Sequence, residues 1–185
     1  MAKRPGTSEE GGIDYTMAKF RLRYKGVFDW EGLYKTMREW FKEREYDFLE
    51  TRYKHKMRSG GLAELEINWK CWREETEYVK NWITVYFHIW DFKEVDVIKN
   101  GKKMKLSKAR MLIEIEPWIE IDYEGRWAGS LLKRKLRDFY NRFLYRVEIE
   151  SLWEDKLWYN SNKLLQLAKR YLEIESESEA FDDYW

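Results

Sequence analysis

Apolar and polar residues alternate along several stretches of the chain with the period of two that is typical of β-strands. The first stretch runs from about Tyr15 to Lys25, where apolar residues alternate with lysine and arginine. Similar stretches lie at Tyr46–Met57, Ala63–Cys71, Tyr78–Trp90 and Ala109–Ile121. The pattern therefore predicts an antiparallel sheet, most of whose strands follow one another directly in the chain.

Two regions carry apolar residues at the spacing of an amphipathic helix. The first follows Asp29, whose side-chain oxygen can accept hydrogen bonds from the free amides of a new helix, and its apolar residues are Trp30, Leu33, Tyr34, Met37, Trp40 and Phe41. The second opens at Gly129-Ser130, and its apolar stripe consists of Leu132, Leu136, Phe139, Tyr140, Phe143 and Val147. We expect both helical regions to pack on the sheet.

Two patterns in the rest of the C-terminal third predict a break in the helix and the binding of a partner helix. Ser151 and Glu154 have the spacing of a capping box, so we expect the helix to end near there and restart. A heptad-like seam follows, formed by Trp153, Leu157, Leu164, Leu167 and Tyr171, with Asn160 at one seam position. Because a polar seam residue can fix the register of partner helices, we expect a protein partner or self-association through the C-terminal helix.

Two short signals concern the connections and edges of the sheet. Asn100-Gly101 has the residues that a tight two-residue hairpin requires, since both central positions need positive φ. Pro117 interrupts the last strand and cannot donate to a ladder, which indicates a sheet edge or a bulge.

Together these elements predict an α+β fold with a curved antiparallel sheet of five to seven strands. One helix follows the first strand, and a long C-terminal helix or helix pair packs on the sheet. We expect a disordered tail at residues 1–12, a single domain at residues 13–173 and an acidic tail at residues 174–185. This element order resembles the helix-grip arrangement of START-like proteins, and that resemblance implies a carrier of hydrophobic small molecules. The chain also resembles uncharacterised archaeal proteins, which implies no activity.

Composition narrows the class of protein. Charged residues make up 37% of the 185 residues, and 35 Lys and Arg balance 34 Asp and Glu. No stretch approaches the ~20 apolar residues that cross a bilayer, so we expect a cytoplasmic protein with no membrane partner. Cys71 is the single cysteine, which excludes an internal disulfide. Abundant Glu, Lys and Arg beside the single glutamine, Gln166, are typical of heat-adapted proteins.

Sequence motifs of common enzymes are missing. The chain has no Gly-rich phosphate loop, HExxH, GxSxG or EF-hand loop. The alternation places Cys71 and His88 on opposite faces of the sheet, so they cannot form a nucleophilic dyad, and we interpret His55 as structural. We therefore expect no catalytic residue and no cofactor.

Charged residues on the strands offer one alternative. Cations of the first two strands and carboxylates of later strands are expected on one sheet face, and they are Arg21, Arg23, Arg52, Lys54, Glu64, Glu66, Glu114 and Glu116. With its strand-helix-strand opening, the chain resembles the triphosphate tunnel enzymes of the CYTH group. That resemblance implies polyphosphate held by the cations and a divalent metal held by the acids. The first strand lacks the ExExK signature of that family, which Glu64, Glu66 and Lys70 echo on a later strand. Cross-strand ion pairing explains the same residues without a ligand.

A second cationic region lies at the predicted hairpin, where six basic residues occur with no acid among them: Lys99, Lys102, Lys103, Lys105, Lys108 and Arg110. Four more open the second helix, and they are Lys133, Arg134, Lys135 and Arg137. Because a helix N-terminus prefers negative charge, an anion would complete this region. The candidates are the acidic strand, the acidic tail or an external phosphate backbone, and binding of nucleic acid is a low-ranked alternative.

Tryptophan supplies the last signal, with 11 copies in the chain. Most of these residues fit core stripes. Trp82, Tyr86, His88 and Trp90 instead share the face opposite the aliphatic stripe of their strand, as expected of residues that bind a ligand or partner. The sequence therefore favours a non-enzymatic binding or assembly module, with the hydrophobic carrier and the CYTH-like phosphohydrolase as alternatives.

Overall fold

The computed structural model describes residues 6–7, 13–58, 61–99, 102–127, 129–143 and 145–172. Within them the chain forms a seven-stranded antiparallel sheet, in which β1, β2, β7, β6, β5 and β4 are neighbours in that order and β3 also pairs with β7. The strands are β1 (Gly6–Thr7), β2 (Ile13–Thr16), β3 (Phe20–Phe28), β4 (Asp47–Met57), β5 (Ala63–Glu74), β6 (Val79–Lys99) and β7 (Lys102–Ile121).

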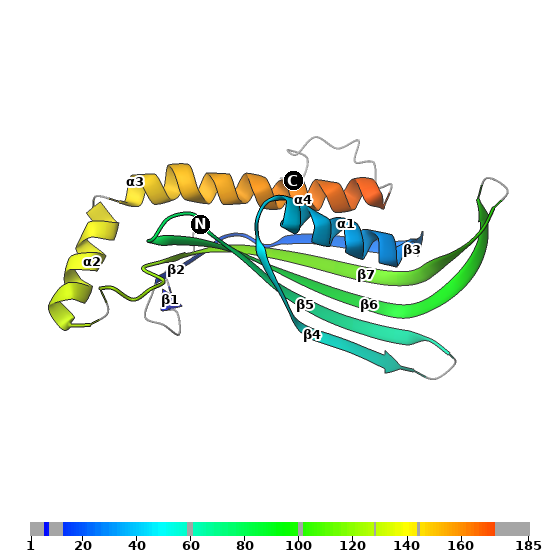
Figure 1. Ribbon diagram of the computed structural model, residues 1–185. Helices are drawn as coiled ribbons and strands as arrows, with labels where there is room; N and C mark the ends of the chain where they lie inside the picture. The colour runs from blue at the N-terminus through cyan, green and yellow to red at the C-terminus, as the bar shows by residue number, and fades with distance from the viewer. Residues whose placement is uncertain are drawn as a thin grey trace, which may run out of the picture.

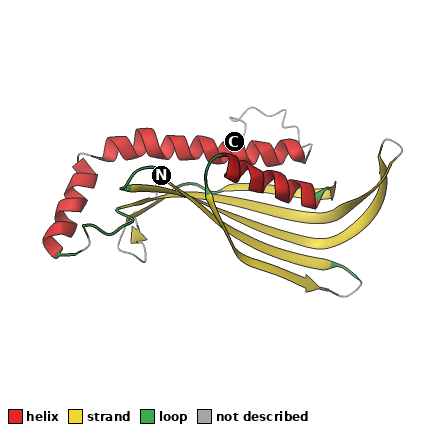
Figure 2. Cartoon of the chain, in the orientation of Figure 1, coloured by secondary structure: helices red, strands yellow, loops and turns green. Residues whose placement is uncertain are grey.

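The helices are α1 (Trp30–Glu43), α2 (Leu131–Phe143), α3 (Arg146–Glu148), a π-helical segment (Ile149–Glu154) and α4 (Asp155–Tyr171). α1 and α4 lie on the same side of the curved sheet (Figures 1 and 2). α1 and α4 lie along the sheet, whereas α2 projects past its end (Figure 1). We call the sheet face that carries α1 and α4 the inner face and the opposite one the outer face. The predicted fold class is confirmed, including the helix after the first long strand and the C-terminal helix.

Strict alternation on the central strands separates the two faces. Ile67 of β5 lies opposite Phe87 of β6, which lies opposite Ile113 of β7, and all three are buried on the inner face. Side chains that are directly opposite in neighbouring strands share a face, so such rows repeat along the sheet. The inner face therefore forms one continuous apolar layer, as the alternation predicts.

Trp69 lies at the centre of the contact between the sheet and α1. Its side chain is fully buried, and its ring contacts Tyr34 of α1 at 4.9 Å, Phe87 at 4.7 Å and Phe48 at 5.0 Å between centroids. These edge-on arrangements are the favoured geometry of aromatic pairs. Trp69 thus joins α1 to three neighbouring strands.

Asp29 caps α1, as predicted, and also ties it to α4. Its Oδ1 accepts a hydrogen bond from the amide of Gly32 at 3.0 Å. Its Oδ2 accepts a second one from the hydroxyl of Tyr171, at the end of α4, at 3.0 Å. One carboxylate therefore fixes the start of α1 and the end of α4.

Pro117 lies in a central strand, so the prediction of a sheet edge is wrong, but the pairing on one side of it is irregular, because four steps from Thr16 to Phe20 lie opposite three steps from Trp118 to Ile115. Pro117 pairs with Ile83 of β6 without a shift of register, and its carbonyl accepts a hydrogen bond from the amide of Met17. The N–H and C=O of a residue in an antiparallel strand point to the same side. The missing N–H of Pro117 therefore faces the side where the predicted strand 15–25 is broken into β2 and β3.

A β-bulge in β4 breaks the alternation of the predicted strand Tyr46–Met57, which on its own would place Glu50 on the same face as Arg52 and Lys54. The register with β5 shifts between Glu50 and Arg52. Glu50 consequently lies on the inner face, where it accepts hydrogen bonds from Tyr34 at 2.6 Å and from Trp69 at 3.1 Å. The extra residue of a bulge flips one side chain relative to the next.

The helix break lies earlier than the predicted capping box. α2 ends at Phe143, and the chain then continues through the π-helical segment into α4. Ser151 does not cap, because its hydroxyl donates to the carbonyl of Val147 at 2.6 Å. The predicted seam is buried within the chain: Leu157 and Leu164 are fully buried, and α4 contacts α1, β3 and β7.

The apolar stripe of α2 does not pack on the sheet, contrary to expectation. Its large side chains are exposed, whereas Arg137 and Asn141 on the other side of the helix are buried. Figure 1 shows α2 beyond the end of the sheet.

Three predictions, the hairpin turn and the two tails, concern residues that lie wholly or partly outside the described ones. Asn100 and Gly101 lie outside them, although β6 and β7 pair up to Lys99 and Lys102 on either side. β1 lies within the stretch expected to be a tail, and the tail residues 1–5, 8–12 and 173–185 are likewise not described. Among the described helices, none has the length and apolarity needed to span a bilayer.

Replacing Trp69 with alanine tests its central position. The variant loses aromatic contacts with α1, β4 and β6 and leaves a cavity, so we expect the free energy of unfolding to fall by about 3–5 kcal/mol. Trp158→Ala is the matched control, because this tryptophan is 40% exposed. Urea unfolding measures both. Equal losses in the two variants would contradict the central role of Trp69.

Candidate functional site

The outer face carries most residues that the sequence selects as site candidates, and none of the described helices covers it (Figures 1 and 2). Trp82, Tyr86, His88 and Trp90 alternate with the buried residues of β6. Each of the four is half-buried. We describe three zones of this face: a charged centre, a row of tryptophans on one side of it along the strands and a patch around Trp90 on the other side.

Ion pairs between neighbouring strands occupy the charged centre. Between β3 and β7, Arg21 pairs with Glu114 at 2.6 Å. Between β4 and β5, Arg52 and Lys54 pair with Glu66 at 2.7 and 3.4 Å. The predicted cations and acids therefore share one surface. Among the described residues, all of them except Arg23 pair with an opposite charge. The sheet that carries them is open, because β4 does not pair with β1, β2 or β3.

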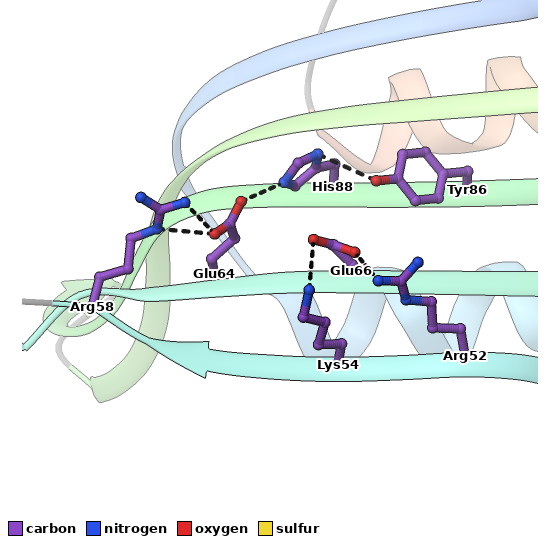
Figure 3. Close-up of polar contacts among 7 residues, drawn as sticks. All are labelled: Arg52, Lys54, Arg58, Glu64, Glu66, Tyr86 and His88. Carbon is purple, nitrogen blue, oxygen red and sulfur yellow. Dashed lines mark hydrogen bonds and ion pairs between the residues drawn. The ribbon is translucent and has the colours of Figure 1, made fainter.

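Glu64 is the most constrained carboxylate of this centre (Figure 3). It is 8% exposed, and its Oε1 lies 2.7 Å from Nε2 of His88 while its Oε2 accepts from Nε of Arg58 at 2.9 Å. The hydroxyl of Tyr86 lies 3.3 Å from Nδ1 of the same histidine. Hydrogen bonds from His88 and Arg58 lower the pKa of Glu64 to about 2.

Glu64, Glu66 and His88 also meet the distance requirement of a metal site, since one ligand atom from each lies within 4.8 Å of the others. Two carboxylates and an imidazole could hold a divalent transition metal. Both oxygens of Glu64 are already hydrogen-bonded, and Glu66 is held by Arg52 and Lys54. A metal would have to displace cations from both acids, so the arrangement fits a self-neutralised network better. The other two predicted acids lie on β7 and belong to separate ion pairs. Glu114 pairs with Arg21, and Glu116 pairs with Lys19 at 2.9 Å.

The tryptophan row consists of Trp72, Trp82 and Trp118, which lie directly opposite one another on β5, β6 and β7. The rings of Trp82 and Trp118 are stacked at 4.9 Å with an interplanar angle of 4°. The indole N–H of Trp82 donates to Glu120 at 2.9 Å, and the ammonium of Lys80 lies 5.5 Å from the Trp82 ring. Contacts with one another and with Glu120 and Lys80 therefore hold these rings in place, and together they form an aromatic surface.

The Trp90 patch combines an aromatic ring with cations. Trp90 stacks on His88 at 3.9 Å and lies opposite Arg110, which in turn lies opposite Lys25 of β3. Arg23 is opposite Leu112 in the adjacent row. An open pocket is lined by residues that include Arg23, Lys25, Trp90, Arg110 and Leu112. We use the name Trp90 patch for these five residues.

The cations of the Trp90 patch differ from those of the charged centre. Arg110 pairs with Asp91 at 2.6 Å. Arg23 and Lys25 are exposed and form no ion pair with any residue that the structure describes. The patch therefore has spare positive charge beside an aromatic ring.

Not all predicted anion-binding residues join this patch. Lys105 pairs with Glu94 at 3.6 Å, and the side chains of Lys102 and Lys103 lie outside the described residues. The sequence did not place Lys25 and Leu112 at a site. The register of β3 against β7 was the missing signal, because it brings both residues beside Arg110.

The predicted separation of Cys71 and His88 is confirmed. Cys71 is fully buried on the inner face, and burial raises the pKa of its thiol. His88 lies on the outer face with Glu64. His55 of β4 lies opposite Leu65, so it belongs to the inner side and not to the outer face.

Comparison with known proteins adds little to this geometry. No family model matches the chain, and no solved structure matches it either. A DNA-dependent protein kinase catalytic subunit from Dictyostelium discoideum is 20% identical over 158 residues, which are 85% of this chain. The chain spans 4% of the length of that protein.

The low pKa of Glu64 predicts how the outer face responds to acid. The pKa of this carboxyl falls from 4.5 in the unfolded chain to about 2 in the folded one. The contribution of Glu64 to stability is therefore present above pH 4.5 and is lost as the pH falls toward 2. We expect Glu64→Gln to lower the urea midpoint near neutral pH and to converge with the wild type toward pH 2.

Glu31→Gln is the control for this comparison, because Glu31 pairs with Lys35 at 3.9 Å on α1 and both side chains are exposed. Its urea midpoint should follow that of the wild type throughout. A deficit of Glu64→Gln that stays constant from neutral pH to pH 2 would exclude the proposed linkage.

Proposed function

We propose that this chain is a non-enzymatic binding module that binds single-stranded nucleic acid on its outer face, with the Trp90 patch as the contact point. The observation that carries the proposal is the position of Trp90. It lies half-buried on an uncovered face, beside Arg23 and Lys25, which have no ion-pair partner among the described residues.

The chemistry of the patch matches that class of ligand. Proteins that bind single strands stack bases on aromatic side chains and track the phosphate backbone with cations. Trp90 offers a ring whose orientation is fixed by stacking on His88. Arg23, Lys25 and Arg110 supply positive charge on the same face. Because the antiparallel sheet is open, a single strand of nucleic acid has room to extend along its outer face.

An internal ligand has weaker support. The space between the sheet and α1 is filled by contacts such as Trp30 with Phe87 at 5.4 Å between ring centroids. A pocket beside it is lined by apolar side chains together with polar ones, Asp29, Glu31, His55, Glu94 and Lys105 among them. Carriers of hydrophobic molecules need an apolar cavity. The tunnel of a CYTH-like enzyme needs a closed sheet, whereas this one is open.

Assembly through the tryptophan row is the second candidate. Aromatic side chains that remain half-exposed on an uncovered face are typical of protein interfaces. Trp72, Trp82 and Trp118 form such a surface at the end of the outer face away from Trp90. Light scattering of the wild type and of Trp118→Ala distinguishes this candidate from nucleic-acid binding.

A cytoplasmic location accompanies the main proposal. Nucleic acid is accessible there, and a single buried cysteine without a disulfide suits a reducing compartment.

Titration of a fluorescent single-stranded oligonucleotide tests the main proposal. We expect Trp90→Ala to weaken binding about 5- to 100-fold, the range of one lost stacked base. Arg23→Ala with Lys25→Ala should weaken binding and reduce the slope of log K against log salt by about 1.4, for two lost phosphate contacts.

Matched controls come from the opposite side of the molecule. Trp158→Ala and Lys35→Ala change an exposed tryptophan of α4 and an exposed lysine of α1, and they should leave the affinity unchanged. Binding that is insensitive to salt, or equal losses in patch and control variants, would rule out this site.

A further inference from the structure

α2 is attached to the rest of the chain by its polar side. The guanidinium of Arg137 donates to Asp122 at 3.2 Å, and the two side chains are only 6% and 1% exposed. Asn141, one turn further along, accepts a hydrogen bond from the hydroxyl of Tyr78 at 2.9 Å. Breaking a buried ion pair leaves an uncompensated charge, so these contacts hold the orientation of α2.

The opposite side of α2 is apolar and exposed. Its large side chains are between 41% and 78% exposed, and they are Leu132, Leu136, Phe139, Tyr140 and Phe143. At 3.6 residues per turn they fall within a sector of about 100°. We call these five residues the apolar face of α2. A contiguous apolar patch of this kind is typical of a surface that binds a partner or a membrane.

Cations border the apolar face of α2 on both sides. On the helical wheel Lys133 follows Tyr140 on one edge, while Lys135 and Arg142 follow Phe139 on the other. All three cations are exposed. A counter-surface that covers the apolar face therefore meets positive charge along both of its edges, which favours an anionic surface.

The charges that border the apolar face of α2, and the contacts that attach the helix, favour one kind of partner for this face over the others. Pairing of α2 with a second copy would bring like charges together on both edges, whichever way the helices ran. A groove on another protein that enclosed α2 would also have to contact its polar side. Arg137 and Asn141 hold that side against the rest of this chain. A flat anionic surface needs only the exposed side.

We propose that α2 docks this protein onto the surface of a membrane that contains anionic lipids. The five apolar side chains enter the boundary between headgroups and acyl chains, and Lys133, Lys135 and Arg142 reach the lipid phosphates. This is surface attachment of an amphipathic helix, and it requires no membrane-spanning segment. It departs from the expectation of no membrane partner, which was based on the lack of an apolar stretch long enough to cross a bilayer. It does not depend on the Trp90 patch.

Cosedimentation with vesicles tests the proposal on the full chain. We expect the wild type to bind vesicles of phosphatidylcholine and phosphatidylserine and to bind pure phosphatidylcholine at least about tenfold more weakly. Leu136→Glu with Phe139→Glu should reduce binding to the anionic vesicles by at least about tenfold. Lys133→Glu with Lys135→Glu should reduce it as well and remove its dependence on salt.

Tyr159→Glu is the matched control, because Tyr159 of α4 is 58% exposed outside α2, and it should bind as the wild type does. All substituted side chains are exposed, so far-ultraviolet circular dichroism should show an unchanged fold. Amide hydrogen exchange gives a second measurement, and it should slow within α2 when anionic vesicles are added.

Three outcomes would overturn the proposal. The first is equal binding to neutral and anionic vesicles, and the second is no binding to either. The third is a wild-type dimer in light scattering that Leu136→Glu with Phe139→Glu converts to a monomer without any vesicle binding, which would assign the apolar face of α2 to contact between copies.

Discussion

The burial of Trp69 between the central strands and α1 governs both faces of this protein. Its ring is enclosed by Tyr34, Phe48 and Phe87, so β5 and its neighbours must point their large apolar side chains toward the helices. Alternation along a strand then sends every other side chain to the outer face. Those residues have no helix above them among the described elements, and they satisfy one another instead through ion pairs and stacked rings.

The fold could be predicted from the sequence where a pattern is local. The alternation on β5 and β6 and the cap at Asp29 depend on neighbouring residues, and both are confirmed. The bulge that turns Glu50 to the inner face and the strand break opposite Pro117 depend on the partner strand. Single-sequence periodicity contains no information on that partner, so both features were missed.

The candidate site shows the same division between local and non-local information. Arg21 and Arg23 look equivalent in the sequence, since both alternate with buried residues of one strand. The register of β3 against β7 places Glu114 opposite Arg21 and Leu112 opposite Arg23. One arginine is therefore neutralised and the other is available to a ligand. The register of the two strands thus decides which arginine has an opposite charge beside it, and the sequence of one strand alone does not contain that register.

α2 extends this reasoning to a helix. Helical periodicity separates an apolar face from a polar one, but it does not say which of them packs on the protein. Here Asp122 and Tyr78 hold the polar face through Arg137 and Asn141, which leaves the apolar face outside. Tyr78 and Trp90 lie roughly 40 Å apart along the direction of β6, at about 3.4 Å per residue. The sheet therefore separates the two proposed surfaces, and both can be occupied at once.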